Sequence, residues 1–227
     1  MLARVSRTYS EDSCASCDGG RSVSRKKKRV NDLGAVRRQS GISLLELVLV
    51  LGIAMVLLAI GLPAFLTMLH TIQLSSGATQ VGDILRQARY AAISQNKSVR
   101  CIFQPSSTNP GMTVFWVDSN PNGTQDPTEP MVLLTIEGNL VDPASVPNTD
   151  GLISQAAVGT AGMTPQAPGG GTIAFDARGA VSPLNVNIFY LANGNAPEVG
   201  FRAVLLMPTG SLQIWSADTS GNWAAVR

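Results

Sequence analysis

Hydrophobic residues are spaced unevenly along the chain, and their first dense stretch is long enough to cross a bilayer. From Ile42 to Leu69 the sequence is apolar with a single charge, at Glu46. Because an α-helix rises 1.5 Å per residue, about twenty such residues span the hydrocarbon core of a membrane. This stretch is therefore predicted to be a transmembrane helix, with a bend at Pro63.

The helical pattern continues beyond the apolar run. Between Leu66 and Ala92, apolar residues recur at three- and four-residue spacing, with charged and amide side chains between them. The pattern predicts one long helix from Ile42 to about Asn96, loosened near Ser75–Gly77. Its second half is amphipathic, so we expect that half to pack one face against a globular head.

After Asn96 the hydrophobic period changes from about 3.6 residues to 2, which is typical of β-strands. The connection Asp142–Gly171 is rich in Gly, Pro, Ala and Ser and is predicted to be a mobile surface loop. The expected fold class is α+β, with a long N-terminal membrane-spanning helix packed against an antiparallel β-sheet head. The predicted strands are Val99–Phe103, Met112–Val117, Met131–Ile136, Thr172–Phe175, Val186–Leu191, Phe201–Met207 and Ser211–Trp215.

The net charge of +2 hides an asymmetry between the N-terminus and the rest of the chain. Residues 1–41 carry ten Lys and Arg against four acids, whereas the remainder carries seven against eleven. Lys and Arg beside a hydrophobic span mark its cytoplasmic side, so the head is expected on the opposite, periplasmic side. A head with a net charge of −4 also has little general affinity for DNA.

The residues that usually carry catalysis or bind metals are sparse. Cys14 and Cys17 form a CxxC pair, but a zinc site needs two further ligands, and His70 is the single histidine of the sequence. The sequence contains no G-x-S-x-G motif and no phosphate-binding loop. We therefore expect neither an enzyme nor a cofactor site, and we interpret the CxxC pair as incidental.

The segment Gly41-Ile-Ser-Leu-Leu-Glu46 resembles the processing motif of the type IV pilin and pseudopilin superfamily. The resemblance implies that a prepilin peptidase cuts between Gly41 and Ile42 and methylates the new amino terminus of Ile42. It also implies that Pro63 stands where members of this superfamily bend the helix. Ile42 replaces the phenylalanine that the superfamily prefers at the first mature position.

Four segments of the predicted helix and head narrow the resemblance to the GspH/FimT group of minor pseudopilins. This resemblance implies a structural subunit that helps to initiate or cap a periplasmic filament of a type II secretion system or a type IV pilus. The implied partners are the prepilin peptidase, other pilins or pseudopilins and the inner membrane. The segments are Arg86–Asn96 with Val99-Arg100 after it, Phe115–Asn120 with Asp126 and Glu129, Phe175–Gly179 and Pro208–Ile214.

A carboxylate near the start of a membrane helix needs a physical explanation, because ionisable groups are costly in a bilayer. Cleavage after Gly41 would create an amine on Ile42, and in a staggered bundle this amine can meet Glu46 of a neighbouring subunit. An ion pair in low dielectric offsets the desolvation of both charges and fixes the axial register. The alternative is that Glu46 extends to the headgroups and has no partner.

These expectations divide the chain into four parts. They are the basic leader 1–41, the transmembrane half of the helix 42–69, the amphipathic half 70–96 and the β-rich periplasmic head 97–227. The alternative is an exported soluble β-domain whose signal peptide is cleaved after Gly61.

Two further binding functions stay open as alternatives. The segment 118–129 fits the calcium-loop pattern D-x-[DN]-x-[DN]-G-x5-E, although predicted strands rather than helices flank it, which favours a structural turn. The final twelve residues carry Arg227 as their one cation, so DNA binding through a basic tail is only weakly indicated. The oxygen ligands of the calcium pattern would come from Asp118, Asn120, Asn122, the Thr124 carbonyl, Asp126 and Glu129.

Overall fold

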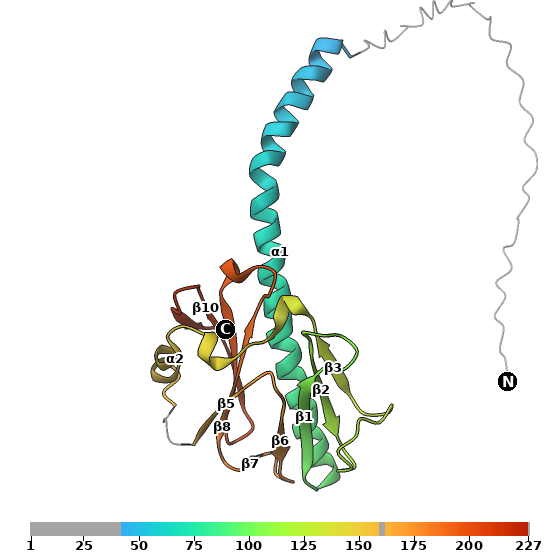
Figure 1. Cartoon of the computed structure of the whole chain (residues 1–227), viewed down its shortest axis with the longest axis vertical. Coiled ribbons are helices and arrows are strands. Elements are labelled where there is room, and N and C mark those ends of the chain that lie inside the picture. The colour runs from blue at the N-terminus through green and yellow to red at the C-terminus, as the bar shows by residue number, and fades with distance from the viewer. Residues whose placement is uncertain (1–41, 159–161, 227) are drawn as a thin grey trace, which may run out of the picture. The chain divides into compact units, whose positions relative to one another are not determined.

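The computed structural model describes residues 42–158 and 162–226, and the predicted leader with Gly41 lies outside these residues. The first element is the 52-residue helix α1, Leu44–Gln95, which runs down the length of Figure 1 and enters the head with its second half. Pro63 lies inside this helix, which continues through it. Within the described residues, the long helix predicted from hydrophobic spacing is thus confirmed, with bounds that differ by one or two residues.

The predicted loosening of the helix near Ser75–Gly77 is wrong, because α1 is continuous there. Gly77 is buried instead of being a break point, and its Cα hydrogen faces the backbone of Gly138. A glycine in this position permits close approach of two backbones. The weak helix-forming residues of this segment therefore reflect packing against the head.

In the described part of the chain, five strands form the first sheet, which we call sheet A. All its neighbouring strands are antiparallel, in the order β3-β2-β1-β6-β7. Its centre is the hairpin of β1 and β2, in which Arg100 pairs with Asp118 and Ile102 with Trp116. The strands are β1 (Val99–Pro105), β2 (Thr113–Asp118), β3 (Met131–Leu134), β6 (Gly171–Phe175) and β7 (Val181–Ser182).

The remaining strands of the described residues form sheet B, in the order β11-β10-β9-β8-β4. These neighbours are antiparallel, and β5 adds a parallel pairing to β8. The last strand brings the C-terminal segment back onto the sheet edge. The strands are β4 (Asn139–Leu140), β5 (Met163–Gln166), β8 (Val186–Ala192), β9 (Phe201–Leu206), β10 (Leu212–Ala217) and β11 (Trp223–Ala225).

The main core lies between the second half of α1 and the inner faces of both sheets. Three phenylalanines from the two sheets meet at its centre: the ring centroids of Phe103 and Phe115 are 5.2 Å apart, and that of Phe189 lies 5.5 Å from Phe103. Aromatic pairs in this range add to the stability gained from apolar burial. On the helix side this core contains Leu74, Ala78, Val81, Ile84, Leu85, Ala88 and Ala92.

A second hydrophobic cluster covers the opposite face of sheet B. Tyr190 and Trp223 are part of it, with ring centroids 6.0 Å apart, and Leu152 of helix α2 (Thr149–Gln155) is fully buried in it. Burial on both faces explains why β8 and β9 are almost continuously apolar. Burial also raises the pKa of Tyr190 to about 12, with a smaller contribution from the charge of Asp150.

The prediction that Asp142–Gly171 is a mobile surface loop is wrong for most of that segment. It contains a short 3-10 helix η2 (Pro143–Ser145), helix α2 and strand β5, although residues 159–161 lie outside the description. The predicted strand Met131–Ile136 is also shorter, because β3 ends at Leu134 and the chain then enters the 3-10 helix η1 (Ile136–Gly138). A further 3-10 helix, η3 (Pro197–Val199), precedes β9. The other predicted strands are confirmed to within one or two residues.

Candidate functional site: the apolar half of helix α1 and the β2–β3 loop

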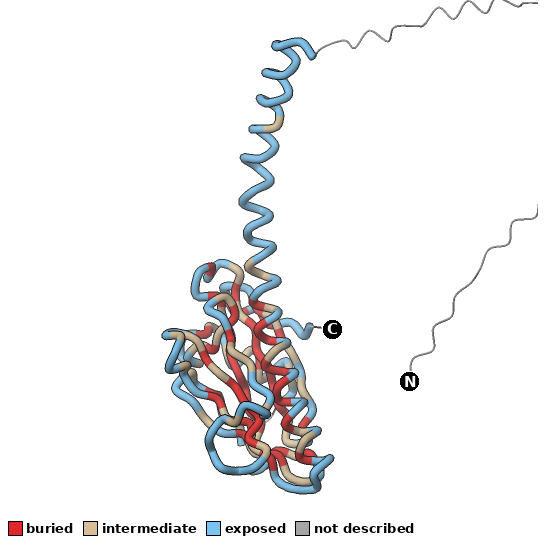
Figure 2. Tube along the Cα trace, turned by 90° about the vertical axis from the view of Figure 1, so that its right-hand side faces the viewer, coloured by how far each residue is buried: buried red, intermediate tan, exposed pale blue. Residues whose placement is uncertain are grey.

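Apolar side chains surround the first half of α1 on all sides. The large apolar residues from Leu44 to Leu66 are each 46–81 % exposed, and Figure 2 shows almost all of this half as exposed. Exposure of so much apolar surface to water is unfavourable, at about 25 cal/mol per Å². Within the described residues, α1 is the one helix long and apolar enough to cross a membrane.

The predicted processing and assembly residues lie at the start of this helix. Ile42 precedes α1 by two residues and is exposed, and Glu46 is in the first turn. Carboxylates in a first turn interact favourably with the partial positive charge of the helix N-terminus. No ion pair in the described part of the chain involves Glu46.

A ladder of hydroxyl groups follows Pro63 along one side of α1. Thr67, Thr71, Ser75 and Thr79 each donate a side-chain hydrogen bond to the backbone carbonyl four residues earlier, at 2.9–3.2 Å. These bonds satisfy the hydroxyls locally, so the helix carries polar residues here without needing partners from elsewhere. The ladder thus spans the transition from the apolar half to the head.

The head contacts α1 closely near Gly77. A Cβ built on Gly77 would lie 2.5 Å from the carbonyl oxygen of Gly138, so these two backbones leave no room for a side chain. Beside this contact, Arg202 of β9 is 8 % exposed and donates from Nε to the hydroxyl of Ser75 at 3.3 Å. Burial lowers the pKa of the Arg202 guanidinium. The joint between helix and head therefore depends on both close packing and a polar contact.

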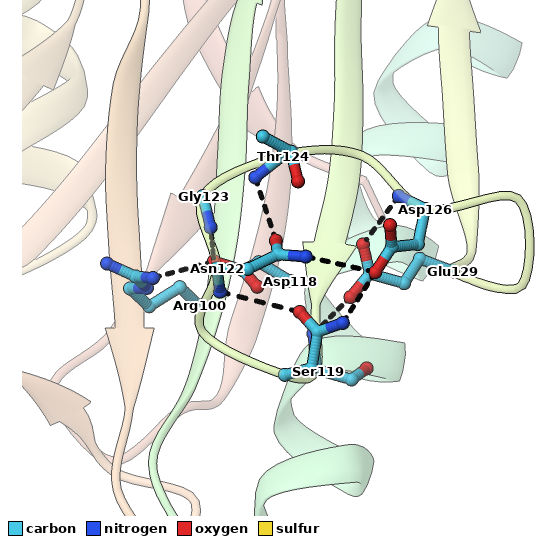
Figure 3. A network of polar contacts seen from close by, with 9 residues as sticks. Arg100, Asp118, Ser119, Asn122, Gly123, Thr124, Asp126 and Glu129 are labelled. Carbon is cyan, nitrogen blue, oxygen red and sulfur yellow. Dashed lines mark hydrogen bonds and ion pairs between the residues drawn. The ribbon is translucent and has the colours of Figure 1, made fainter.

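The β2–β3 loop contains the calcium-pattern residues, and its polar groups form a connected network (Figure 3). At its start, Asp118 is fully buried and pairs with Arg100, with 2.8 Å between Nη2 and Oδ2. The same Oδ2 atom accepts the backbone N–H of Gly123 at 3.1 Å. The Oδ1 atom of Asp118 is buried and has no hydrogen-bond partner among the described residues.

The end of the loop folds back onto its beginning through Glu129. Its Oε1 accepts the backbone N–H of Ser119 at 2.7 Å, and its Oε2 accepts that of Asp126 at 3.1 Å. The side-chain amides of Asn120 and Asn122 donate to the Asp126 carboxylate. In residues 42–158 and 162–226, no three His, Cys, Asp or Glu side chains are grouped closely enough to hold a metal by themselves. Hydrogen bonds among its own residues therefore hold the loop in a defined conformation.

The outer face of sheet A carries an apolar strip beside this loop. Trp116 lies in a cleft of about 480 Å³ together with Met131 and Leu133, and Thr124 of the loop forms part of its wall. Trp116 is 3 % exposed, and its indole N–H has no acceptor among the described residues. The cleft was not predicted from the sequence, although the strand alternation places Ile102 and Trp116 on one face.

The sequence interpretation also missed Arg100 as the partner of Asp118. The antiparallel register of β1 and β2 places these two residues directly opposite each other, on the outer face of sheet A. A charged residue within the otherwise apolar run Val99–Phe103 was the available signal. Without the register of the hairpin, this signal does not indicate which acid is the partner.

Comparison with known protein families shows which family the chain belongs to. The sequence model described as Type II transport protein GspH matches residues 78–210, more than half of the chain. The chain belongs to the GspH family. The predicted resemblance to this group is therefore confirmed.

Two solved structures are similar to this GspH-family chain, and both are crystal forms of the type IV minor pilin FimU from Pseudomonas aeruginosa. One has 16 % sequence identity and a TM-score of 0.41, with 68 % of this chain and 92 % of FimU covered. The other has 17 % identity and a TM-score of 0.39, with 68 % and 98 % covered. A search of curated proteins gives no significant match.

Proposed function

We propose that this GspH-family chain is a minor pseudopilin that helps to initiate or cap a periplasmic filament of a type II secretion system or type IV pilus. The observation that carries the proposal is the two-part helix α1. Its first half exposes apolar side chains on all sides, and its second half forms part of the head core. One rigid helix can thereby anchor the subunit in the membrane and position its head among neighbouring heads.

The proposed topology follows from the charge asymmetry. The basic leader 1–41 stays in the cytoplasm, residues 42–69 span the inner membrane, and residues 70–96 and 97–227 form the periplasmic helix half and head. A prepilin peptidase would cut between Gly41 and Ile42 and methylate Ile42, with Pro63 as the site of a bend. The N-terminal residue of the membrane-resident protein tests this step directly.

Mass spectrometry of the membrane-resident protein should identify Ile42 as the first residue, methylated at its amine. Leu62 as the first residue would contradict the proposal and support export of a soluble head. The continuity of α1 through Gly61 and Leu62 supports the pilin interpretation, because cleavage there would divide an intact helix. A protein with residues 1–41 still attached would also refute the proposed processing.

Glu46 is proposed to pair with the Ile42 amine of a neighbouring subunit and so to set the axial register of assembly. The substitution Glu46→Ala should leave cleavage at Gly41 intact and reduce incorporation into filaments to background. The matched control is Asp83→Asn, which removes one exposed charge from the head half of α1 and should leave incorporation unchanged. Normal incorporation of the Glu46→Ala protein would refute the pairing.

A further inference from the structure

We propose that the β2–β3 loop, residues 118–129, binds a calcium ion, a property independent of filament assembly. The residues at positions 1, 3, 5, 9 and 12 of the loop are Asp118, Asn120, Asn122, Asp126 and Glu129, all of which carry side-chain oxygens. Calcium prefers six to eight such oxygen ligands, including amide and backbone carbonyl oxygens. A calcium loop therefore does not require three carboxylates that already converge.

The Asp118 carboxylate is the observation that points to a cation. It is fully buried, and its Oδ2 atom is occupied by Arg100 and by the N–H of Gly123. Its Oδ1 atom has no hydrogen-bond partner and points into the loop (Figure 3). A buried carboxylate oxygen without a partner is unfavourable, and a bound cation at this place would satisfy it.

Completing the site would change the partners of three loop side chains. Glu129 already lies across the loop, where its two oxygens accept the N–H groups of Ser119 and Asp126. Calcium would replace these two N–H groups as the partner of Glu129. The amides of Asn120 and Asn122 now donate to Asp126, while their oxygens accept the backbone N–H groups of Asn122 and Thr124. A bound ion would take these amide oxygens as ligands.

Arg100 reduces the net negative charge of the proposed site. Its guanidinium pairs with Asp118, so the loop offers three carboxylates and one nearby cation. Affinity in calcium loops falls when fewer net negative charges surround the ion, and extracellular modules have dissociation constants of about 10⁻⁴–10⁻³ M. We therefore expect weak binding in this range, suited to a periplasmic protein. Binding would stiffen the loop wall of the Trp116 cleft.

The first test is thermal unfolding of the full chain in detergent, with tryptophan fluorescence as the readout. Calcium chloride at about 10 mM should raise the melting temperature by roughly 3–6 °C relative to a chelator, and equimolar magnesium chloride should not. Glu129→Gln should abolish the rise, whereas Asp83→Asn, on helix α1, should retain it. Absence of a calcium-specific rise in the wild-type chain would overturn the proposal, as would an equal rise in Glu129→Gln.

A second test remains valid if Glu129→Gln lowers stability. Terbium(III), which binds calcium sites, should show tryptophan-sensitised luminescence that added calcium reduces. The nearby indole is that of Trp116, whereas Trp215 and Trp223 belong to the cluster on sheet B. Trp116→Phe should therefore remove most of the signal, and Trp223→Phe should preserve it. Luminescence that is insensitive to calcium or independent of Trp116 would overturn the assignment.

Discussion

The two halves of helix α1 belong to one continuous element but meet different surroundings. In the first half, Leu58 is 65 % exposed. A Cβ atom built on Gly52 or on Gly61 would have no neighbouring atom within 4 Å. In the second half, Leu85 is fully buried and Gly77 contacts the Gly138 backbone. The same residue types thus lie in the head core in one half and on an exposed apolar surface in the other.

The comparison shows that apolar content alone does not reveal what a helix packs against. The first half is apolar on every side, as expected for a helix surrounded by lipid. In the second half, apolar residues recur every three or four positions and so form one face of the helix, and this face is buried in the head core. Matched substitutions in the two halves can therefore separate head stability from membrane anchoring. The three tryptophans all lie in the head, so their fluorescence reports head unfolding.

The largest expected difference between the halves comes from leucine truncation. Leu85→Ala should lower the free energy of unfolding of the head by about 2–5 kcal/mol, because it leaves a cavity in the core. Leu58→Ala should change it by less than about 0.5 kcal/mol, since Leu58 makes no head contact. Chemical denaturation in detergent measures both values. Equal effects of the two substitutions would contradict the division of the helix.

A second pair of substitutions tests the close contact between helix and head. Gly77→Ala should destabilise the head by about 1–3 kcal/mol, because the new methyl group would overlap the Gly138 carbonyl oxygen. Gly52→Ala has open space around it and should leave head unfolding unchanged within about 0.5 kcal/mol. Thermal unfolding of both variants provides the comparison. An unchanged melting temperature for Gly77→Ala would show that the Gly138 backbone can move away from the helix at little cost.

The stability of the head core should also depend on alkaline pH, because Cys101 lies in this core beside the second half of α1. Burial raises the pKa of its thiol from 9.0 to about 12. The unfolded chain therefore loses this proton first, and the stabilising contribution declines as pH rises above 9. Between pH 9 and 10 the loss should be about 1 kcal/mol. Urea unfolding of wild type and Cys101→Ala measures it, and identical pH slopes would refute the buried thiol.

The smallest expected effect concerns the hydroxyl ladder between the two halves. Thr71→Val keeps a β-branched side chain of similar shape and removes a hydroxyl that is satisfied by the Thr67 carbonyl of the same helix. Head stability should change by less than about 0.5 kcal/mol. Thermal unfolding provides the measurement. A loss above about 1 kcal/mol would mean that Thr71 bonds to a group outside its own helix.

Much of the fold was predictable because the hydrophobic pattern is strong. The helix bounds follow from an apolar run joined to a 3.6-residue period, and the longer strands follow from alternation. Helix α2 was missed because Gly151 and the surrounding polar residues give no helical pattern. Its stability comes from burial of Leu152 under sheet B. The two-residue strand β4 exists only through pairing with the distant strand β8, which no local pattern specifies. The two-residue strand β7 pairs across a tight turn with β6 and is too short to show alternation.

The candidate sites were predictable to different degrees. Gly41 and Glu46 were identified from their spacing, and their proposed roles remain predictions. The loop ligands were found from a sequence pattern, whereas burial of the Asp118 carboxylate and its pairing with Arg100 required the register of β1 and β2. The Trp116 cleft depends on how two loops frame the face of sheet A, and single-strand patterns do not contain that information.

The short distance between anchor and head has a mechanical consequence. The first helix residue in the main core is Leu74, five residues after Leu69, where the apolar run ends. Five residues of helix are about 7.5 Å long, and the contact of Gly77 with Gly138 follows within one turn. In the proposed membrane topology, a rotation of the apolar half of α1 about the helix axis would therefore be transmitted to the head with little torsional slack.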